Sequence, residues 1–280
     1  MSFLPLTQAS FGPPGSCLEV SGAFGIHQDH PSGVNHMLYA RFAQKFAGVS
    51  LATVLSVPLL PPLVAAEPYE AVFDFKIAGI RAGEIAMSGR DEGRSYEANA
   101  EVRTAGVVSI FADFFYDGTA KGGVAANGRV VPDSFVASSK SPRDRRETRI
   151  EWEQGTPVFV SVEPPRSSSP EPSKQSGTVD PVSASFALLR DGPSDEICRN
   201  SVDVFDGSRR SRITLGTPQT DGENLVCNGS YERLEGEGNS FNTSSSYSFR
   251  VVYRKAGAGE ARLERIETRT DYGMAALVRK

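Results

Sequence analysis

Hydrophobic and polar residues alternate along most of the chain after residue 67. The clearest case runs from Tyr69 to Ile77, where every second residue is apolar and charged residues occupy the other side. This period of two predicts a half-buried β-strand. Turn signals such as Asp117-Gly118 and Asn127-Gly128 divide the remaining chain into short segments of the same kind. The pattern predicts about a dozen strands, with the spacing typical of barrels and curled sandwiches.

The stretch from Gly177 to Gly192 departs from this alternation and predicts a helix at Asp180 to Arg190, ended by Gly192-Pro193. Asp180 is placed to cap the helix N-terminus, and Pro181 follows where a helix tolerates proline. Apolar residues then recur at helical spacing, with Phe186 among them. Because a lone short helix is not stable in water, we expect the sheet to cover its apolar face.

These patterns together predict an all-β fold. We expect a large curled antiparallel sheet or barrel-like domain, with one short helix packed against it or inside it. Curling around a helix is one way for such a sheet to protect its edges. Residues 164–176 are rich in proline and serine and are expected to form a solvated loop within a single domain at 67–280.

The segment at 37–66 has the pattern of a secretory signal peptide. Arg41 and Lys45 precede an uncharged apolar run, and small residues end at Ala66. A membrane anchor is the alternative, but prolines interrupt the run and it is shorter than the roughly 20 residues that a span requires. Residues 1–36 are then either a mis-assigned start, with Met37 as the initiator, or a disordered leader. We expect export to the periplasm and no stable membrane span in the exported chain.

Removal of residues 1–66 changes which chemistry is available. The three histidines, His27, His30 and His36, all lie in the removed part. A hydrolase that uses a histidine base is therefore excluded for the exported domain, and a zinc site is not expected. The net charge stays at −4, because the segment contains two acids and two bases. This balance gives no indication of nucleic-acid binding.

Two cysteines, Cys198 and Cys227, remain after Cys17 is removed. An even number of cysteines in an exported protein predicts a disulfide, with two free buried thiols as the alternative. They flank a predicted hairpin at 202–215, so a bond between them would tie the end of the helix to the sheet.

Four segments resemble a bacterial envelope family catalogued as domain of unknown function 3108. They are Tyr69 to Glu84, Asp180-Pro181-Val182-Ser183-Ala184 leading to Leu188-Leu189-Arg190, Val204-Phe205-Asp206-Gly207 followed by Arg209-Arg210, and Cys227-Asn228-Gly229-Ser230-Tyr231. The resemblance covers nearly all of residues 67–280. It implies an exported, barrel-like all-β protein without established catalytic residues, and no enzyme is expected.

Two groups of residues are candidates for ligand contacts. Four aromatic residues predict either the lining of a pocket for an apolar ligand or plain hydrophobic core: Phe111, Phe114, Phe115 and Phe186. Three arginines after the Asp206-Gly207 turn predict either contacts to an anionic group or pairing with nearby acids: Arg209, Arg210 and Arg212.

The function expected from the sequence is non-enzymatic support of the cell envelope. The protein is predicted to carry a lipid or other apolar ligand, or to bind an envelope protein, without a cofactor or a metal. The alternative is a hydrolase of envelope polysaccharide that uses carboxylates such as Asp113 and Asp117.

Overall fold

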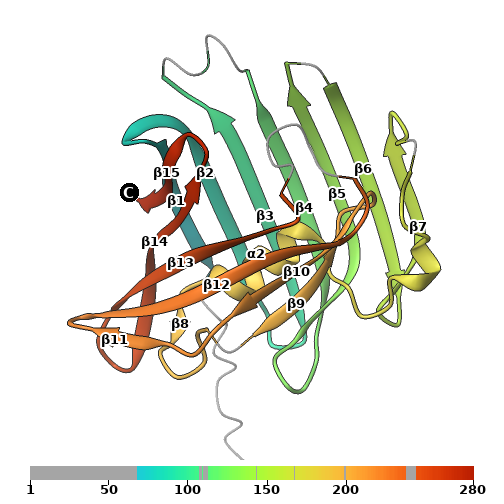
Figure 1. Ribbon diagram of the computed structural model, residues 1–280. Coiled ribbons are helices and arrows are strands. Elements are labelled where there is room, and N and C mark those ends of the chain that lie inside the picture. Colours follow the sequence, from blue (N-terminus) through green and yellow to red (C-terminus); the bar gives the residue numbers. More distant parts are fainter. Residues whose placement is uncertain are drawn as a thin grey trace, which may run out of the picture. The chain divides into compact units, whose positions relative to one another are not determined.

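The computed structural model describes residues 68–280 except 107–108, 110–112, 143, 167, 199 and 238–243. The strands of this part form a 15-stranded sheet that curls around helix α2 (Pro181–Leu189) (Figure 1). The predicted all-β class, with a helix packed against a large curled sheet, is confirmed. The predicted leader at 1–36, the predicted signal peptide at 37–66 and the candidate Phe111 lie outside the described residues.

The paired strands are antiparallel and follow the order β7-β6-β5-β4-β3-β2-β1-β15-β14-β13-β12-β10-β9, with β11 beside β12 and β8 beside β14. Most neighbours in the sheet are also neighbours in sequence, as expected for hairpins joined by short turns. The strands are β1 (Tyr69–Ile77), β2 (Ile80–Asp91), β3 (Ser95–Thr104), β4 (Phe115–Val124), β5 (Val130–Ser141), β6 (Asp144–Glu153), β7 (Thr156–Glu163), β8 (Gly192–Pro193), β9 (Ser201–Phe205), β10 (Arg210–Leu215), β11 (Gln219–Asp221), β12 (Asn224–Glu235), β13 (Ser246–Lys255), β14 (Glu260–Thr270) and β15 (Gly273–Arg279).

The two ends of the strand order, β7 and β9, are joined by the segment that leads into the helix. This segment contains the 3-10 helix η1 (Pro172–Lys174). The Gly177 nitrogen donates to the Gly155 oxygen in the β6–β7 turn at 2.8 Å. The Val179 nitrogen then donates to the Asp203 oxygen in β9 at 2.9 Å. The sheet is therefore barrel-like, and residues 177–179 connect its two edges.

Helix α2 lies on the inner face of the sheet, against β3, β4, β5 and β9 (Figure 1). The Asp180 carboxylate accepts from the backbone nitrogens of Val182 and Ser183 at 2.9 and 2.8 Å, so the helix begins where the sequence predicts. Phe186 is 2% exposed and packs directly on β2. A Cβ atom on Gly89 would lie 2.5 Å from the Phe186 ring, so a glycine is required at that position for the ring to pack.

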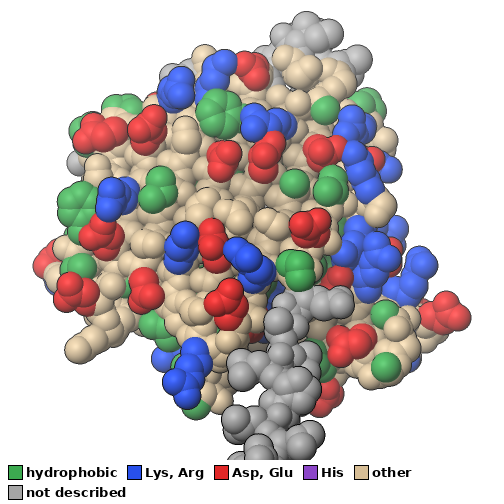
Figure 2. Space-filling model, turned by 180° about the vertical axis from the view of Figure 1, so that it is seen from behind, with side chains coloured by type: hydrophobic (Ala, Val, Ile, Leu, Met, Phe, Trp, Pro, Cys, Tyr) green, Lys and Arg blue, Asp and Glu red, His purple; other side chains and the backbone are tan. Residues whose placement is uncertain are grey.

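Strand register separates a buried inner face from a charged outer face. Ala120 in β4 and Ile150 in β6 point inward and are fully buried. On the other side of the same strands, acidic and basic residues pair across the sheet, for example Lys121 with Glu97 at 3.4 Å. Figure 2 views the molecule from behind and shows acidic and basic side chains interleaved on this face, with apolar ones scattered singly.

A disulfide joins Cys198 to Cys227, as the sequence predicts, with 5.9 Å between their Cα atoms. Cys198 belongs to the loop after β8, and Cys227 lies in β12. Both residues are buried. The bond therefore attaches the chain that leaves the helix to strand β12 of the sheet.

Two local predictions differ from the structure. Asp117-Gly118, which the sequence predicts as a turn, lies inside β4 and pairs with β3 and β5. The loop at 164–176 is not fully solvated, since Gln175 is completely buried. Its side-chain nitrogen donates to the Glu171 carbonyl oxygen and to the Glu235 carboxylate at 3.2 and 3.3 Å.

Replacing Phe186 with alanine should lower the free energy of unfolding by about 3–5 kcal/mol, because it removes a buried ring that cannot be refilled by a neighbour. Urea denaturation measures this loss. Val158→Ala, at a position 55% exposed, is the control and should change stability by less than about 0.5 kcal/mol. An equally small loss for Phe186→Ala would mean that the helix does not support the core.

Removing the disulfide, as Cys227→Ser or by reduction, should cost about 2–5 kcal/mol of stability and lower the melting temperature. Alkylation with and without reductant, followed by peptide mapping, identifies the bonded pair. Recovery of both cysteines as alkylated thiols from unreduced native protein would contradict the bond.

Candidate functional site

A cavity of about 1280 Å³ opens at the end of the sheet that carries the β4–β5 and β6–β7 turns. Helix α2 contributes Phe186, Ala187 and Leu188 to its wall, and β9 and β10 contribute Val202 and Leu215. The volume exceeds the range of about 300–1,000 Å³ that is usual for small-molecule sites. An elongated ligand would find both an apolar surface and room in this cavity.

Charged residues line the part of the cavity near the helix C-terminus. Arg190 pairs with Asp91 at 3.1 Å, and its guanidinium lies 4.8 Å from the centre of the Phe186 ring. This stacking and the ion pair hold Arg190 against the cavity wall. Arg129, on the β4–β5 side, also lines the cavity and has no ion-pair partner among the described residues.

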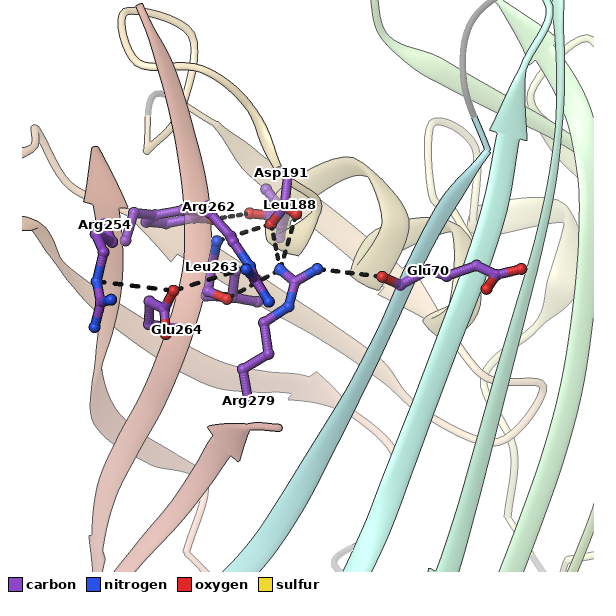
Figure 3. Close-up of polar contacts among 9 residues, drawn as sticks. Glu70, Leu188, Asp191, Arg254, Arg262, Leu263, Glu264 and Arg279 are labelled. Atoms are coloured by element: carbon purple, nitrogen blue, oxygen red, sulfur yellow. Dashed lines mark hydrogen bonds and ion pairs between the residues drawn. The ribbon is translucent and has the colours of Figure 1, made fainter. Parts of the chain in front are cut away.

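A partly buried ion pair fixes the chain that follows the helix (Figure 3). One terminal nitrogen of Arg279 donates to both carboxylate oxygens of Asp191, at 2.7 and 2.8 Å, and the other donates to the Glu70 carbonyl oxygen at 3.2 Å. The Asp191 carboxylate also accepts from the Leu263 nitrogen at 2.8 Å. The Arg279 side chain is only 8% exposed. Strands β1, β14 and β15 thereby hold one wall of the cavity in place.

Tyr69 lines the cavity beside this ion pair. Its hydroxyl is buried and has no hydrogen-bond partner in the structure. Burial and the nearby Asp191 carboxylate raise the pKa of Tyr69 above its ordinary value, so the hydroxyl stays protonated. It is therefore a neutral donor without a partner among the described residues.

Asp180, at the N-terminus of helix α2, is a fully buried acid with no exposed surface. Besides the two backbone nitrogens it accepts a bond from the Ser183 hydroxyl, and that hydroxyl lies 2.6 Å from the Tyr96 hydroxyl. Burial raises the pKa of Asp180 to about 6, against the lowering effect of these hydrogen bonds. The carboxylate thus has a structural role that depends on its protonation.

The predicted aromatic set is not brought together. Phe186 lines the cavity, whereas Phe115 shares a register row with Arg103 and Lys140 on the outer face of the sheet. The Arg103 guanidinium lies 5.9 Å from the Phe115 ring. Phe114 is half-buried in the loop before β4. Strand alternation explains the separation, because neighbouring positions 115 and 116 point to opposite faces.

The three predicted arginines pair with nearby acids, which was the second of the two expectations for them. Arg209 binds Asp206 at 2.7 Å, and Arg210 and Arg212 both bind Asp203, at 2.6 and 2.7 Å. Burial favours protonation of Asp203, but its bonds to both arginines outweigh this and hold its pKa below the ordinary value. Arg212 also lines the cavity.

The carboxylates considered for hydrolysis lie elsewhere. Asp113 is exposed and pairs with Lys140 at 2.6 Å, and Asp117 lies on the outer face opposite Glu101 in β3. Neither lines the cavity. Among the described residues, no three histidine, cysteine or acidic side chains are grouped so as to hold a metal ion.

Tyr69, Arg190, Asp191 and Arg279 are the site residues that sequence reasoning did not identify. Arg190 lies in the last turn of the predicted helix and Asp191 directly follows it, so their place at the helix C-terminus is the signal that could have identified them. No local pattern links Asp191 to Arg279, which lies 88 positions later in the chain.

The raised pKa of Asp180 predicts a pH-dependent stability. In the unfolded chain the carboxyl has its ordinary pKa of 3.8, so its contribution to stability is fully present below that pH and is lost as the pH rises through about 6. The loss should approach about 3 kcal/mol, from about 1.4 kcal/mol for each pKa unit. Asp180→Asn keeps an oxygen that can cap the helix and should remove this loss.

Urea unfolding at a series of pH values between about 4 and 7 tests this dependence. The free energy of unfolding of the Asp180→Asn variant, measured relative to that of wild type, should rise as the pH increases across this range. Asp133→Asn, at an exposed position of β5, controls for the removal of one negative charge. Parallel pH profiles for wild type and Asp180→Asn would show that the buried carboxyl does not titrate in this range.

Comparison with known proteins places this chain in a family. The search of curated proteins found no match. Among solved structures, the chain is similar to a β-barrel-like protein of domain of unknown function DUF1849 from Brucella abortus, with 14% identity and a TM-score of 0.40, over 76% of this chain and 95% of that one.

A family model described as "Protein of unknown function (DUF3108)" matches residues 69–229, from β1 into β12 and including helix α2. This confirms the resemblance found in the sequence, and the description names no enzymatic activity. Because the match covers more than half of the 280 residues, the protein belongs to the DUF3108 family.

Proposed function

We propose that this protein is an exported carrier that holds an apolar or amphiphilic ligand in the cavity beside helix α2. The observation that supports this most directly is the cavity itself, which measures about 1280 Å³ and has an apolar wall formed by the helix. Ligand sites are typically concave and mostly apolar, with a few polar groups that orient the ligand.

The polar groups of the cavity favour an amphiphile over a pure hydrocarbon. The buried Tyr69 hydroxyl has no partner, and leaving such a donor unsatisfied costs about 1–3 kcal/mol. A ligand with an acceptor oxygen would recover this cost. Arg129 offers a second donor at the opposite wall, so a polar head group has two places to bind.

Export is supported by the pattern at 37–66 and by the disulfide. Disulfides persist in oxidising compartments and are rare in the reducing cytosol. A carrier located between membranes would need no span of its own. In the described part of the chain, no helix has the length and apolar character required to cross a bilayer.

Native mass spectrometry of the protein recovered from the periplasm tests the proposal. The intact mass should correspond to a chain that begins near Glu67 and has its two cysteines oxidised, and a bound amphiphile should add to it. A chain that begins at Met1 and stays in the inner membrane would contradict export. Ligand-free protein that hydrolyses cell-wall polysaccharide would replace the carrier with a hydrolase.

Ala187→Trp should abolish ligand binding while the fold is kept. Ala187 is half-buried and faces the cavity, so an indole at this position occupies the space that the ligand needs. The variant should purify without the amphiphile and should lose at least about tenfold in affinity for lauric acid, a representative amphiphile. Calorimetric titration measures the affinity.

Val136→Trp is the matched control for this substitution. Val136 lies in β5, is 53% exposed and does not line the cavity. It should bind lauric acid as wild type does. If both tryptophan variants bind like wild type, the ligand does not occupy this cavity.

A further inference from the structure

Three arginines gather at the end of β6 that lies away from the cavity. Arg146 is near the start of β6, Arg166 follows β7, and Arg209 lies in the β9–β10 turn. The cavity, in contrast, reaches Gly155 beyond the other end of β6. These three residues, here called the arginine cluster, are therefore separate from the proposed carrier site.

The curl of the barrel-like sheet brings the cluster together. A Cβ atom on Gly207 would lie 2.9 Å from the Val162 side chain and 3.3 Å from the Thr148 side chain, so the β9–β10 turn packs directly on β6 and β7. The Arg146 guanidinium donates to the Pro164 carbonyl oxygen at 2.6 Å, two residues before Arg166. Three distant segments of the chain thus meet at one point.

The cluster contains one more guanidinium than its carboxylates neutralise. Arg146 pairs with Asp144, and Arg209 donates twice to the Asp206 carboxylate, at 3.0 and 2.7 Å. Arg166 has no ion-pair partner among the described residues, and its buried Nε atom has no hydrogen-bond partner. Burial and the charges of Arg146 and Arg209 lower the pKa of Arg166.

Another donor without a partner lies on the same face of the sheet. Tyr116, Ser139 and Arg146 occupy adjacent register positions on β4, β5 and β6. The Tyr116 hydroxyl is buried and unpaired, and burial together with the Asp180 and Asp206 charges raises its pKa. It stays protonated, and its oxygen lies over Gly118 near helix α2, where a Cβ atom on Gly118 would be 2.6 Å from it, so it is not counted among the groups of the arginine cluster.

We propose that the arginine cluster is a binding site for a phosphate-type oxyanion, held by Arg166 between Arg146 and Arg209. A guanidinium presents planar, forked N–H groups that match the oxygens of a phosphate. Such an anion would supply the missing negative charge and an acceptor for the buried Nε of Arg166. The anion is either free phosphate or the phosphate head group of an amphiphile, since both present the same oxygens.

Calorimetric titration of the full-length exported protein, at constant ionic strength in sodium chloride, tests the site. The probes are inorganic phosphate and dihexanoyl phosphatidic acid, each up to about 10 mM. Saturable binding of inorganic phosphate assigns the site to the free anion. Saturable binding of the phosphatidic acid alone assigns it to a head group if Arg166→Gln weakens that binding and Ala187→Trp, which fills the cavity, does not. Absence of saturable binding for both probes overturns the proposal.

Arg166→Gln should weaken binding of whichever probe binds wild type saturably by at least about tenfold. Arg149→Gln is the matched control, because Arg149 belongs to β6, as Arg146 of the cluster does, is 62% exposed and pairs with Glu151 on the outer face. It should bind as wild type does. Equal loss in both variants would indicate nonspecific attraction by surface charge and would overturn the site.

The melting temperature in chloride gives an independent outcome. Arg166→Gln should melt at the same temperature as wild type or higher, because it removes a half-buried charge that two other arginines repel. A clearly lower melting temperature would show that Arg166 already has a stabilising partner, and would contradict an open anion site.

Discussion

The buried N-terminus of helix α2 is the constraint on which the rest of the structure depends. A helix end leaves several backbone N–H groups unpaired, and their burial is costly unless a side chain accepts from them. Asp180 does so from a position with no exposed surface, and Ser183 and Tyr96 extend the hydrogen bonds to β3. With this end satisfied, the helix can lie inside the curl of the sheet, and the large sheet gains a core.

The chain is held firmly on both sides of the helix. Before it, residues 177–179 bond to the β6–β7 turn and to β9, which connects the edges of the sheet. After it, Asp191 binds Arg279 and the backbone of β14, and the Cys198–Cys227 bond follows a few residues later. The proposed ligand cavity lies along this restrained segment, so its walls are preorganised rather than formed by the ligand.

The curl of the sheet produces two chemically different regions. The cavity beside the helix combines apolar surface with a few donors, among them the buried Tyr69 hydroxyl. The arginine cluster lies where the β9–β10 turn packs on β6 and β7, and it carries excess positive charge. Each region depends on contacts between segments far apart in the chain, and each is proposed to bind a ligand by its own chemistry.

The sequence by itself determined the all-β class, the position of helix α2 and the cysteine pair. These features depend on local rules: alternation along a strand, the Asp180-Pro181 start of a helix, and the presence of two cysteines after residue 66. The family resemblance was also visible in short local motifs, and the family match at 69–229 confirms it.

The tertiary structure alone decided which of these side chains meet. Phe115 and Phe186 are both aromatic. The alternation of side chains along β4 directs Phe115 to the outer face, whereas helix α2 holds Phe186 inside. The pairing of Asp191 with Arg279, and the approach of Arg166 to Arg146 and Arg209, follow from the way the sheet curls. A one-dimensional pattern reports the period of each element but not the partner that another element brings to it, because that partner is set by packing across the whole sheet.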